Sequence, residues 1–144
     1  MSCNKEENNL NTDERMNIDV GYQLFLKNSN GDNLLDPLNN ISFKHSEIKL
    51  YEDAKLNIEI QDSLVYKSPD GYFLHLFGGG EKEMSKNDEN IKYGTSYLKL
   101  NSTTIDTIYS ESIYKNEGLV LNKVIYNSIL VYNFGDDRAI IIIK

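Results

Sequence analysis

Alternation of apolar and polar residues is the dominant pattern of this chain beyond its first 17 positions. In residues 18–27, apolar side chains occupy every second position from Ile18 to Leu26. A period of two predicts a β-strand with one buried face. The sequence Asn-Ser-Asn-Gly-Asp follows at 28–32 and predicts a tight turn, because Asn-Gly accommodates positive φ angles.

Similar short runs predict further strands along the rest of the chain. They lie at 47–51, 55–60, 64–67, 72–77, 91–100, 104–111, 119–126, 129–133 and 138–144. The run 72–77 (YFLHLF) is apolar on both faces apart from His75 and predicts a central strand, which Gly78-Gly79-Gly80 ends. Residues 81–90 are too polar for a core and fit either a short surface helix or a mobile loop.

The number and length of these runs determine the expected fold. About nine short strands, separated by turn signals and without a helix-length pattern, predict an all-β domain. We expect an antiparallel β-sandwich, with a lipocalin-like β-barrel as the alternative, because closed barrels usually have longer strands of more even length. Four consecutive isoleucines in 139–143 predict a buried final strand, unless its edge pairs with another chain.

The start of the chain has a different character from the rest. Residues 3–17 hold only two separated apolar side chains, Leu10 and Met16, and are otherwise rich in Asn and charge. Such a segment cannot bury enough surface to order itself, so residues 1–17 are expected to form a flexible tether. Residues 18–144 then form one β domain, whose length supports a real core. Its stability comes from packing, because one cysteine cannot form an internal disulfide.

Charge and motifs exclude several classes of function. The net charge of −7, with only two arginines, argues against nucleic acid as a partner. No stretch approaches the roughly 20 apolar residues of a membrane span. Nucleophile-elbow, zinc-protease and phosphate-loop motifs are missing from the sequence. His45 and His75 have no sequence neighbour able to orient them as a base, so we expect no enzyme activity, cofactor or metal.

The sequence permits two kinds of functional site. Tyrosines on or near the expected strands could stack on sugar rings or form a protein interface; they are Tyr51, Tyr66, Tyr97, Tyr109 and Tyr132. The 22 acidic residues also allow a carboxylate pair of the kind that hydrolyses glycans, but sequence cannot select one.

The residues around the single cysteine carry a resemblance. Ser2-Cys3, followed by a polar acidic run, resembles the mature end of a bacterial lipoprotein, in which the cysteine carries diacylglycerol. The resemblance implies lipid attachment at Cys3. Lys5-Glu6-Glu7 resembles the Lys-acidic-acidic export signal of Bacteroidetes lipoproteins, which implies an outer-membrane protein displayed at the cell surface. The alternative location is the periplasmic face of that membrane.

Three internal segments extend the resemblance over most of residues 3–133. Gly31–Pro37, Asp106–Ile108 and Lys123–Asn127 are similar to segments of uncharacterised Bacteroidetes lipoproteins. That resemblance implies an extracytoplasmic all-β domain, commonly described as immunoglobulin-like, without an assigned activity. The chain departs from the pattern because it lacks a second acidic residue ahead of Asp106.

Two tripeptides also resemble the Asp-Ser/Thr-aliphatic acceptor of O-glycosylation in Bacteroidetes. They make Ser63 and Thr107 candidate modification sites. Taken together, the sequence predicts a lipid-anchored binding or adhesion module with a protein or glycan ligand. The alternatives are an assembly subunit of an outer-membrane complex and a carboxylate-dependent glycan hydrolase.

Overall fold

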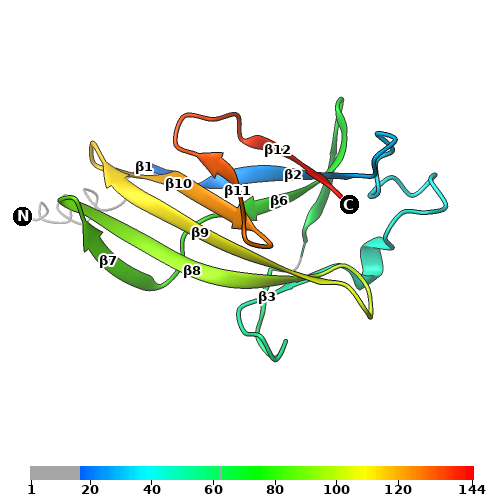
Figure 1. Cartoon of the computed structure of the whole chain (residues 1–144), viewed down its shortest axis with the longest axis horizontal. Helices are drawn as coiled ribbons and strands as arrows, with labels where there is room; N and C mark the ends of the chain where they lie inside the picture. Colours follow the sequence, from blue (N-terminus) through cyan, green and yellow to red (C-terminus); the bar gives the residue numbers. More distant parts are fainter. Residues whose placement is uncertain (1–16, 62) are drawn as a thin grey trace, which may run out of the picture.

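The computed structural model of the protein describes residues 17–61 and 63–144, and this part of the chain is all-β, as predicted (Figure 1). Besides a single-turn 3-10 helix at His45–Glu47, it forms twelve strands: β1 (Asn17–Asp19), β2 (Gly21–Lys27), β3 (Lys49–Tyr51), β4 (Glu59–Gln61), β5 (Val65–Ser68), β6 (Gly71–Phe77), β7 (Lys82–Lys86), β8 (Glu89–Lys99), β9 (Ile105–Lys115), β10 (Gly118–Tyr126), β11 (Ile129–Asn133) and β12 (Ala139–Ile143).

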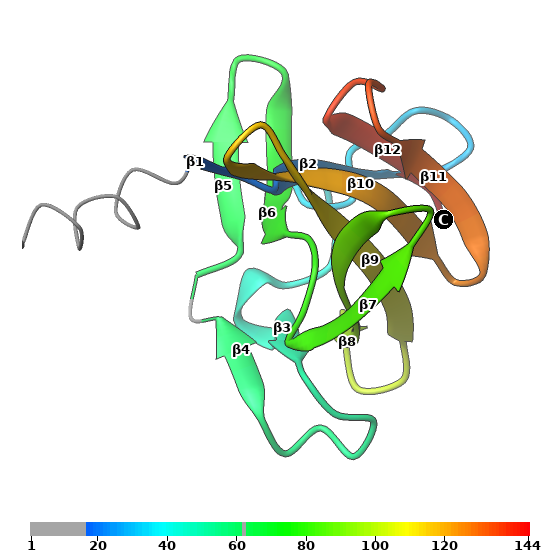
Figure 2. The same ribbon diagram turned by 90° about the vertical axis from the view of Figure 1, so that its left-hand side faces the viewer.

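The strands form two sheets, which confirms the predicted sandwich (Figures 1 and 2). The smaller sheet has four strands in the order β12-β2-β6-β5. The larger has eight, with the main order β1-β10-β9-β8-β3-β4, while β11 pairs with β10 and β7 with β8. Figure 2 shows the larger sheet curling around its long central strands, and β6 is central in the smaller sheet, as its apolar sequence predicted.

The first strand differs from the prediction because it is two strands in two sheets. β1 pairs with β10 in the larger sheet, whereas β2 pairs with β6 and β12 in the smaller one. The chain changes sheets at Val20. The β1–β10 and β2–β12 pairs are parallel, whereas the other strand pairs are antiparallel, as predicted.

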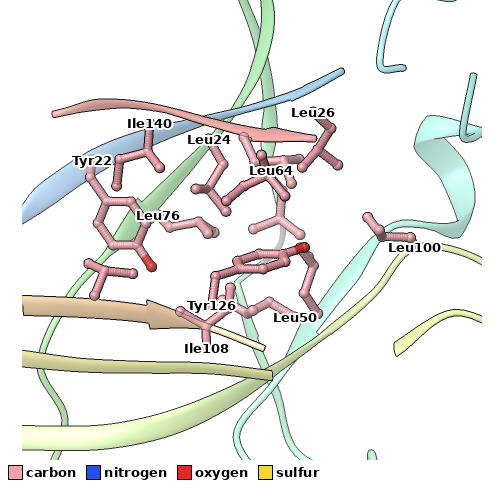
Figure 3. Close-up of a cluster of buried hydrophobic side chains, with 14 of the residues drawn as sticks. Tyr22, Leu24, Leu26, Leu50, Leu64, Leu76, Leu100, Ile108, Tyr126 and Ile140 are labelled. Atoms are coloured by element: carbon pink, nitrogen blue, oxygen red, sulfur yellow. The ribbon is translucent and has the colours of Figure 1, made fainter. Parts of the chain in front are cut away.

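Apolar side chains from both sheets meet in one core. Figure 3 shows Tyr22, Leu24 and Leu76 pointing inward from the smaller sheet toward Ile108 and Tyr126 of the larger one. Complete burial of the Tyr22 phenol raises its pKa far above the ordinary value. In the described part of the chain, no helix has the length and apolar character needed to span a membrane.

Residues 81–90 form neither the surface helix nor the loop expected from their polar sequence. They belong to the hairpin of β7 and β8, which turns at Asn87 and Asp88 with φ angles of 53° and 65°. Side chains on β7 are mostly exposed, so the strand has no need of an apolar face. The polar sequence of this segment therefore corresponds to a hairpin at the edge of the sheet.

The strand expected at 55–60 is also largely replaced by a turn. Leu56 has a φ of 60°, and the Asp53 carboxylate accepts hydrogen bonds from the amides of Asn57 and Ile58. Only β4, beginning at Glu59, remains extended. The alternation in this segment does not reflect a buried face, since Ile58 and Ile60 are both exposed.

Gly78-Gly79-Gly80 ends β6, as predicted, and connects the two sheets. A Cβ at Gly78 would lie 2.1 Å from Leu121 Cδ1, and one at Gly80 would lie 2.3 Å from the carbonyl oxygen of Tyr93. Gly79 has a φ of +93° and donates its amide to Ser110 Oγ at 2.8 Å. The connection therefore passes too close to the larger sheet for any side chain.

The last strand, β12, is only half buried. Ile140 and Ile142 point into the core, but Ile141 and Ile143 are 55% and 61% exposed. The expectation of a fully buried final strand is wrong for one of its two faces.

Candidate ligand-binding face

The outer face of the smaller sheet carries a continuous row of rings, here called the aromatic stripe: Phe25, Tyr66, Phe73, His75 and Phe77. Alternation along β6 places its three members on this face, while Leu74 and Leu76 point into the core. Ring centroids are 5.5 Å apart for Phe25–Phe73, 6.1 Å for Tyr66–Phe73 and 4.9 Å for His75–Phe77.

Two members of the aromatic stripe are open to solvent. Tyr66 is 47% exposed and Phe77 is 59% exposed, whereas Phe25 and Phe73 are buried by their neighbours. The described strands form two sheets and no third one, and the stripe lies on the outer face of the smaller sheet. The result is a base of packed rings in which Tyr66 and Phe77 are accessible.

An open pocket of about 530 Å³ adjoins the Phe77 end and is called the end pocket. Its lining combines ring and aliphatic surface with polar groups. Those residues are Ile18, Asp19, Val20, Gly21, Tyr22, Gln23, His75, Phe77, Asp137, Arg138 and Ala139. They come from the β1–β2 junction, from β6 and from the start of β12, so the change of sheet at Val20 creates the pocket.

Arg138 holds these elements together. Its Nη1 lies 3.1 Å from Asp19 Oδ1 and donates to the carbonyl of Gly21 at 2.7 Å, and its Nε donates to the hydroxyl of Tyr132 at 3.0 Å. A guanidinium fixed by several acceptors is preorganised, because little rotamer freedom remains to be lost on binding. Asp19 keeps a side-chain exposure of 60%.

The combination of these groups suits a saccharide. The C–H faces of a sugar ring are apolar and stack on aromatic faces, while its hydroxyls require both donors and acceptors. Phe77 and His75 supply rings, and Asp19, Gln23 and Asp137 supply carboxylate and amide groups within the same pocket.

A second cleft of about 620 Å³ lies where β8 leaves its pairing with β7 and takes up β3. Tyr93, Tyr97 and Tyr109 line it together with Glu52 and Glu81. A glycosidase acid is usually kept protonated by an apolar, buried setting. Both glutamates are exposed, so this cleft does not favour the hydrolase alternative.

A buried polar cluster joins two of the segments that carry the family resemblance. Asp106, which is 4% exposed, accepts hydrogen bonds from the hydroxyl of Tyr126, from Asn127 Nδ2 at 3.0 Å and from Lys144 Nζ. Burial alone would raise the pKa of Asp106, but these hydrogen bonds and the charge of Lys144 hold it below its ordinary value. The cluster ties β9, β10 and the chain end together, which is a structural role.

The five tyrosines singled out from the sequence do not form one site. Tyr66 lies on the aromatic stripe, and Tyr97 and Tyr109 lie in the second cleft. Tyr51 pairs with Tyr97 across β3 and β8. Tyr132 is buried and accepts a hydrogen bond from Arg138.

The two histidines have different surroundings and do not form one site. His45 Nε2 is 2.6 Å from the carbonyl oxygen of Leu35 and its ring faces Tyr72, so it stabilises the loop after β2. His75 belongs to the aromatic stripe. Among the described residues, no group of three or more His, Cys, Asp or Glu side chains is placed to hold a metal ion.

The remaining predicted sites divide between described and undescribed residues. Cys3, Lys5, Glu6 and Glu7 lie outside the described residues. Ser63 is exposed between β4 and β5, and Thr107 is exposed on β9. The aspartate before Thr107 is Asp106, which is buried.

Sequence reasoning missed the ring and polar groups that the fold brings together. The signal was present in 73–77, where Phe, His and Phe share one face of a period-two strand. Asp19 and Arg138, however, are 119 residues apart, and only the β1–β2 junction reveals their contact.

Comparison of the chain with models of protein families, with curated proteins and with solved structures found no match.

Proposed function

We propose that this domain is a non-catalytic binding module that holds a saccharide on the aromatic stripe and in the end pocket. The observation that carries the proposal is the open row of rings, whose Phe77 end adjoins fixed polar groups. Burial of ring surface supplies affinity, and hydrogen bonds to Asp19, Gln23 and Asp137 supply selectivity.

The proposed location is the cell envelope. Residues 2–7 support lipid attachment at Cys3 and export by Lys5, Glu6 and Glu7 to the outer surface of the outer membrane. A domain held there by its first residues presents its binding face to extracellular glycans. The periplasmic face is the alternative location.

Saccharide binding is tested by calorimetric titration of the full chain against a panel of oligosaccharides, followed by ring substitutions. Phe77→Ala and Tyr66→Ala should each weaken binding about tenfold, since burial of one large apolar side chain is worth about 1.5 kcal/mol or more. Phe134→Ala is the matched control, because Phe134 is 53% exposed and stands beside Lys115, away from the stripe. Failure of every saccharide to bind, or full affinity in both ring variants, contradicts the proposal.

Ser63 and Thr107 remain proposed sites of O-glycosylation. Both side chains are exposed, and the proposed compartment is the one in which such modification takes place. The intact mass of protein from its native host tests them. A polypeptide without added mass would contradict both sites.

A specific observation favours a second candidate function, that of an assembly subunit joined by strand pairing. β12 is an edge strand that pairs only with β2 among the described strands, and its outward isoleucines are exposed.

A further inference from the structure

We infer that β12 is a self-association edge, at which two copies of the chain pair antiparallel about a twofold axis through Ile141. The inference is independent of saccharide binding. It rests on the direction of backbone groups, on the side chains of β12 and on the contrast with the other sheet edges.

Two backbone hydrogen bonds at the ends of β12 fix which of its backbone groups face the open edge. The amide of Gln23 donates to the carbonyl of Arg138 at 2.9 Å, and the amide of Lys144 donates to the carbonyl of Lys27 at 2.7 Å. In a parallel ladder only alternate residues of a strand bond to a given neighbour. The even-numbered residues of β12 therefore bond to β2, and the backbone groups of Ala139, Ile141 and Ile143 point to the open edge.

In one antiparallel register, these backbone groups form hydrogen bonds with the same groups of a second copy. With Ile141 opposite the Ile141 of the second copy, each residue donates its amide to the carbonyl of the other. Ile143 is then opposite Ala139 of the second copy and donates its amide to that carbonyl. The amide of Ala139 already donates to Asp137 Oδ1 at 2.9 Å, so this bond can stay in place.

The side chains fit the same register. On the outer face Ile141 meets its own copy and the large Ile143 meets the small Ala139, while Ile140 meets Ile142 on the core side. No charge lies within the paired segment. The flanking cations are each engaged within their own chain, Arg138 with Asp19 and Lys144 with Asp106, which limits repulsion between the copies.

The other edges carry features that discourage pairing. β7 (KEMSK) is highly charged, and β5 carries Lys67. β1 and β4 have three residues each, and the β10–β11 pair has an irregular register at Val124/Ile125. Native proteins block sheet edges by charge, shortness and irregularity of this kind. β12 is five residues of Ala and Ile in continuous register with β2, and it has none of these features.

The paired edge continues into the apolar outer face of the smaller sheet. Ile141 is opposite Phe25 of the aromatic stripe in the β2–β12 register. A five-residue strand pair buries much less than the roughly 1,200–2,000 Å² of a stable interface, so the dimer forms reversibly at high protein concentration.

Sedimentation velocity of the full chain, from about 10 μM to about 1 mM, measures the association in the range of weak interfaces. We expect a concentration-dependent dimer for the wild type and a monomer throughout for Ile141→Lys. Ile129→Lys is the matched control, because Ile129 is 66% exposed on the β11 edge and should leave the dimer unchanged. A wild-type monomer at every concentration, or a dimer that survives Ile141→Lys, overturns the inference.

Cysteine cross-linking tests the register and does not depend on Ile141→Lys keeping its fold. In a full chain that carries Cys3→Ser, Ile141→Cys should form an intermolecular disulfide, since directly opposed residues have Cα atoms about 5.5 Å apart. Ile143→Cys should not, because its two copies would be separated by roughly 14 Å along the strands. Equal or faster cross-linking at position 143, or none at 141, overturns the proposed pairing.

Discussion

At the scale of single residues, the tightest constraint in the domain is the glycine connection between β6 and β7. The missing Cβ atoms of Gly78 and Gly80 leave room for the side chain of Leu121 and for the backbone of β8. Of the two, Gly80 has the less adaptable surroundings, because the carbonyl of Tyr93 and the Cα of Gly94 cannot rotate away as a side-chain tip can.

Gly80→Ala should therefore lower the free energy of unfolding by about 3 kcal/mol, at the upper end of the usual effect of overpacking. Urea denaturation followed by circular dichroism measures the change. Gly31→Asn is the control, because a Cβ at Gly31 meets no atom within 4 Å and asparagine tolerates its φ of +88°. Equal stability of Gly80→Ala and the wild type would show that the connection can move away from β8.

The Asp106 cluster predicts a pH dependence of stability. Because the folded-state pKa of Asp106 lies below its ordinary value, its contribution is complete above about pH 5 and is lost as the pH falls below about 4. Asp106→Asn should cost about 3 kcal/mol at pH 7, since it removes one partner of a buried ion pair. The difference between wild type and variant should then shrink toward pH 2.

Denaturation at a series of pH values checks this expectation, with Asp70→Asn as the control. Asp70 lies in the exposed turn between β5 and β6, and its substitution should leave stability unchanged at every pH. A difference for Asp106→Asn that stays constant from pH 7 to pH 2 would contradict a lowered pKa.

At the scale of elements, β1 is a short strand at one edge of the larger sheet. Its three residues pair with Gly118, Leu119 and Val120, and all three are exposed. Even so, β1 covers the open edge of β10, and Asp19 anchors Arg138 beside it.

Two truncations separate the expected tether from this strand. Deletion of residues 1–16 should change the thermal midpoint by less than about 3 °C, because Leu10 and Met16 are the only large apolar side chains beyond Met1 that it removes. Deletion of residues 1–20 should lower the midpoint clearly, since it removes β1 and the Asp19–Arg138 contact. Thermal denaturation measures both, and a large loss in the shorter deletion would show that the tether belongs to the folded domain.

Sequence reasoning located most strands of this domain. It failed where the apolar–polar pattern of a segment does not match the solvent exposure of that segment in the fold. The runs at 72–77 and 119–126 became β6 and β10, because each has a face to bury, and the run at 129–133 became β11, in which only Tyr132 is buried. β7 was missed because both of its faces are in water, so that its polar residues resemble a loop. Three rings of the aromatic stripe were recognisable on β6, but the end pocket depends on pairings that only the tertiary structure creates.

At the scale of the whole molecule, the proposed anchoring and the proposed binding face lie on separate parts of the chain. Two or more acyl chains on one cysteine hold a protein on a membrane essentially permanently, at about 0.8 kcal/mol per buried CH₂. Lipid attachment at Cys3 would leave both sheets free of the bilayer, because no part of the folded domain is needed for the anchor.

Cys3→Ala should therefore release the protein into the soluble fraction of the native host. Combined replacement of Lys5, Glu6 and Glu7 by Ala should keep the protein in the membrane fraction but protect it from protease added to whole cells. Fractionation and protease accessibility measure the two effects separately. Digestion of the triple variant at the wild-type rate would contradict the export signal while leaving the lipid anchor in place.

The change of sheet at Val20 has a mechanical consequence for a domain held by its N-terminal side. Tension applied ahead of Asn17 reaches β1 in the larger sheet and, one residue after β1 ends, β2 in the smaller sheet. Arg138 joins these two strands through Asp19 and Gly21 and is itself attached to Tyr132 on β11. A pull from the proposed anchor would thus be divided between both layers of the sandwich, so the domain should resist shear as one body when a ligand on the proposed binding face is under load.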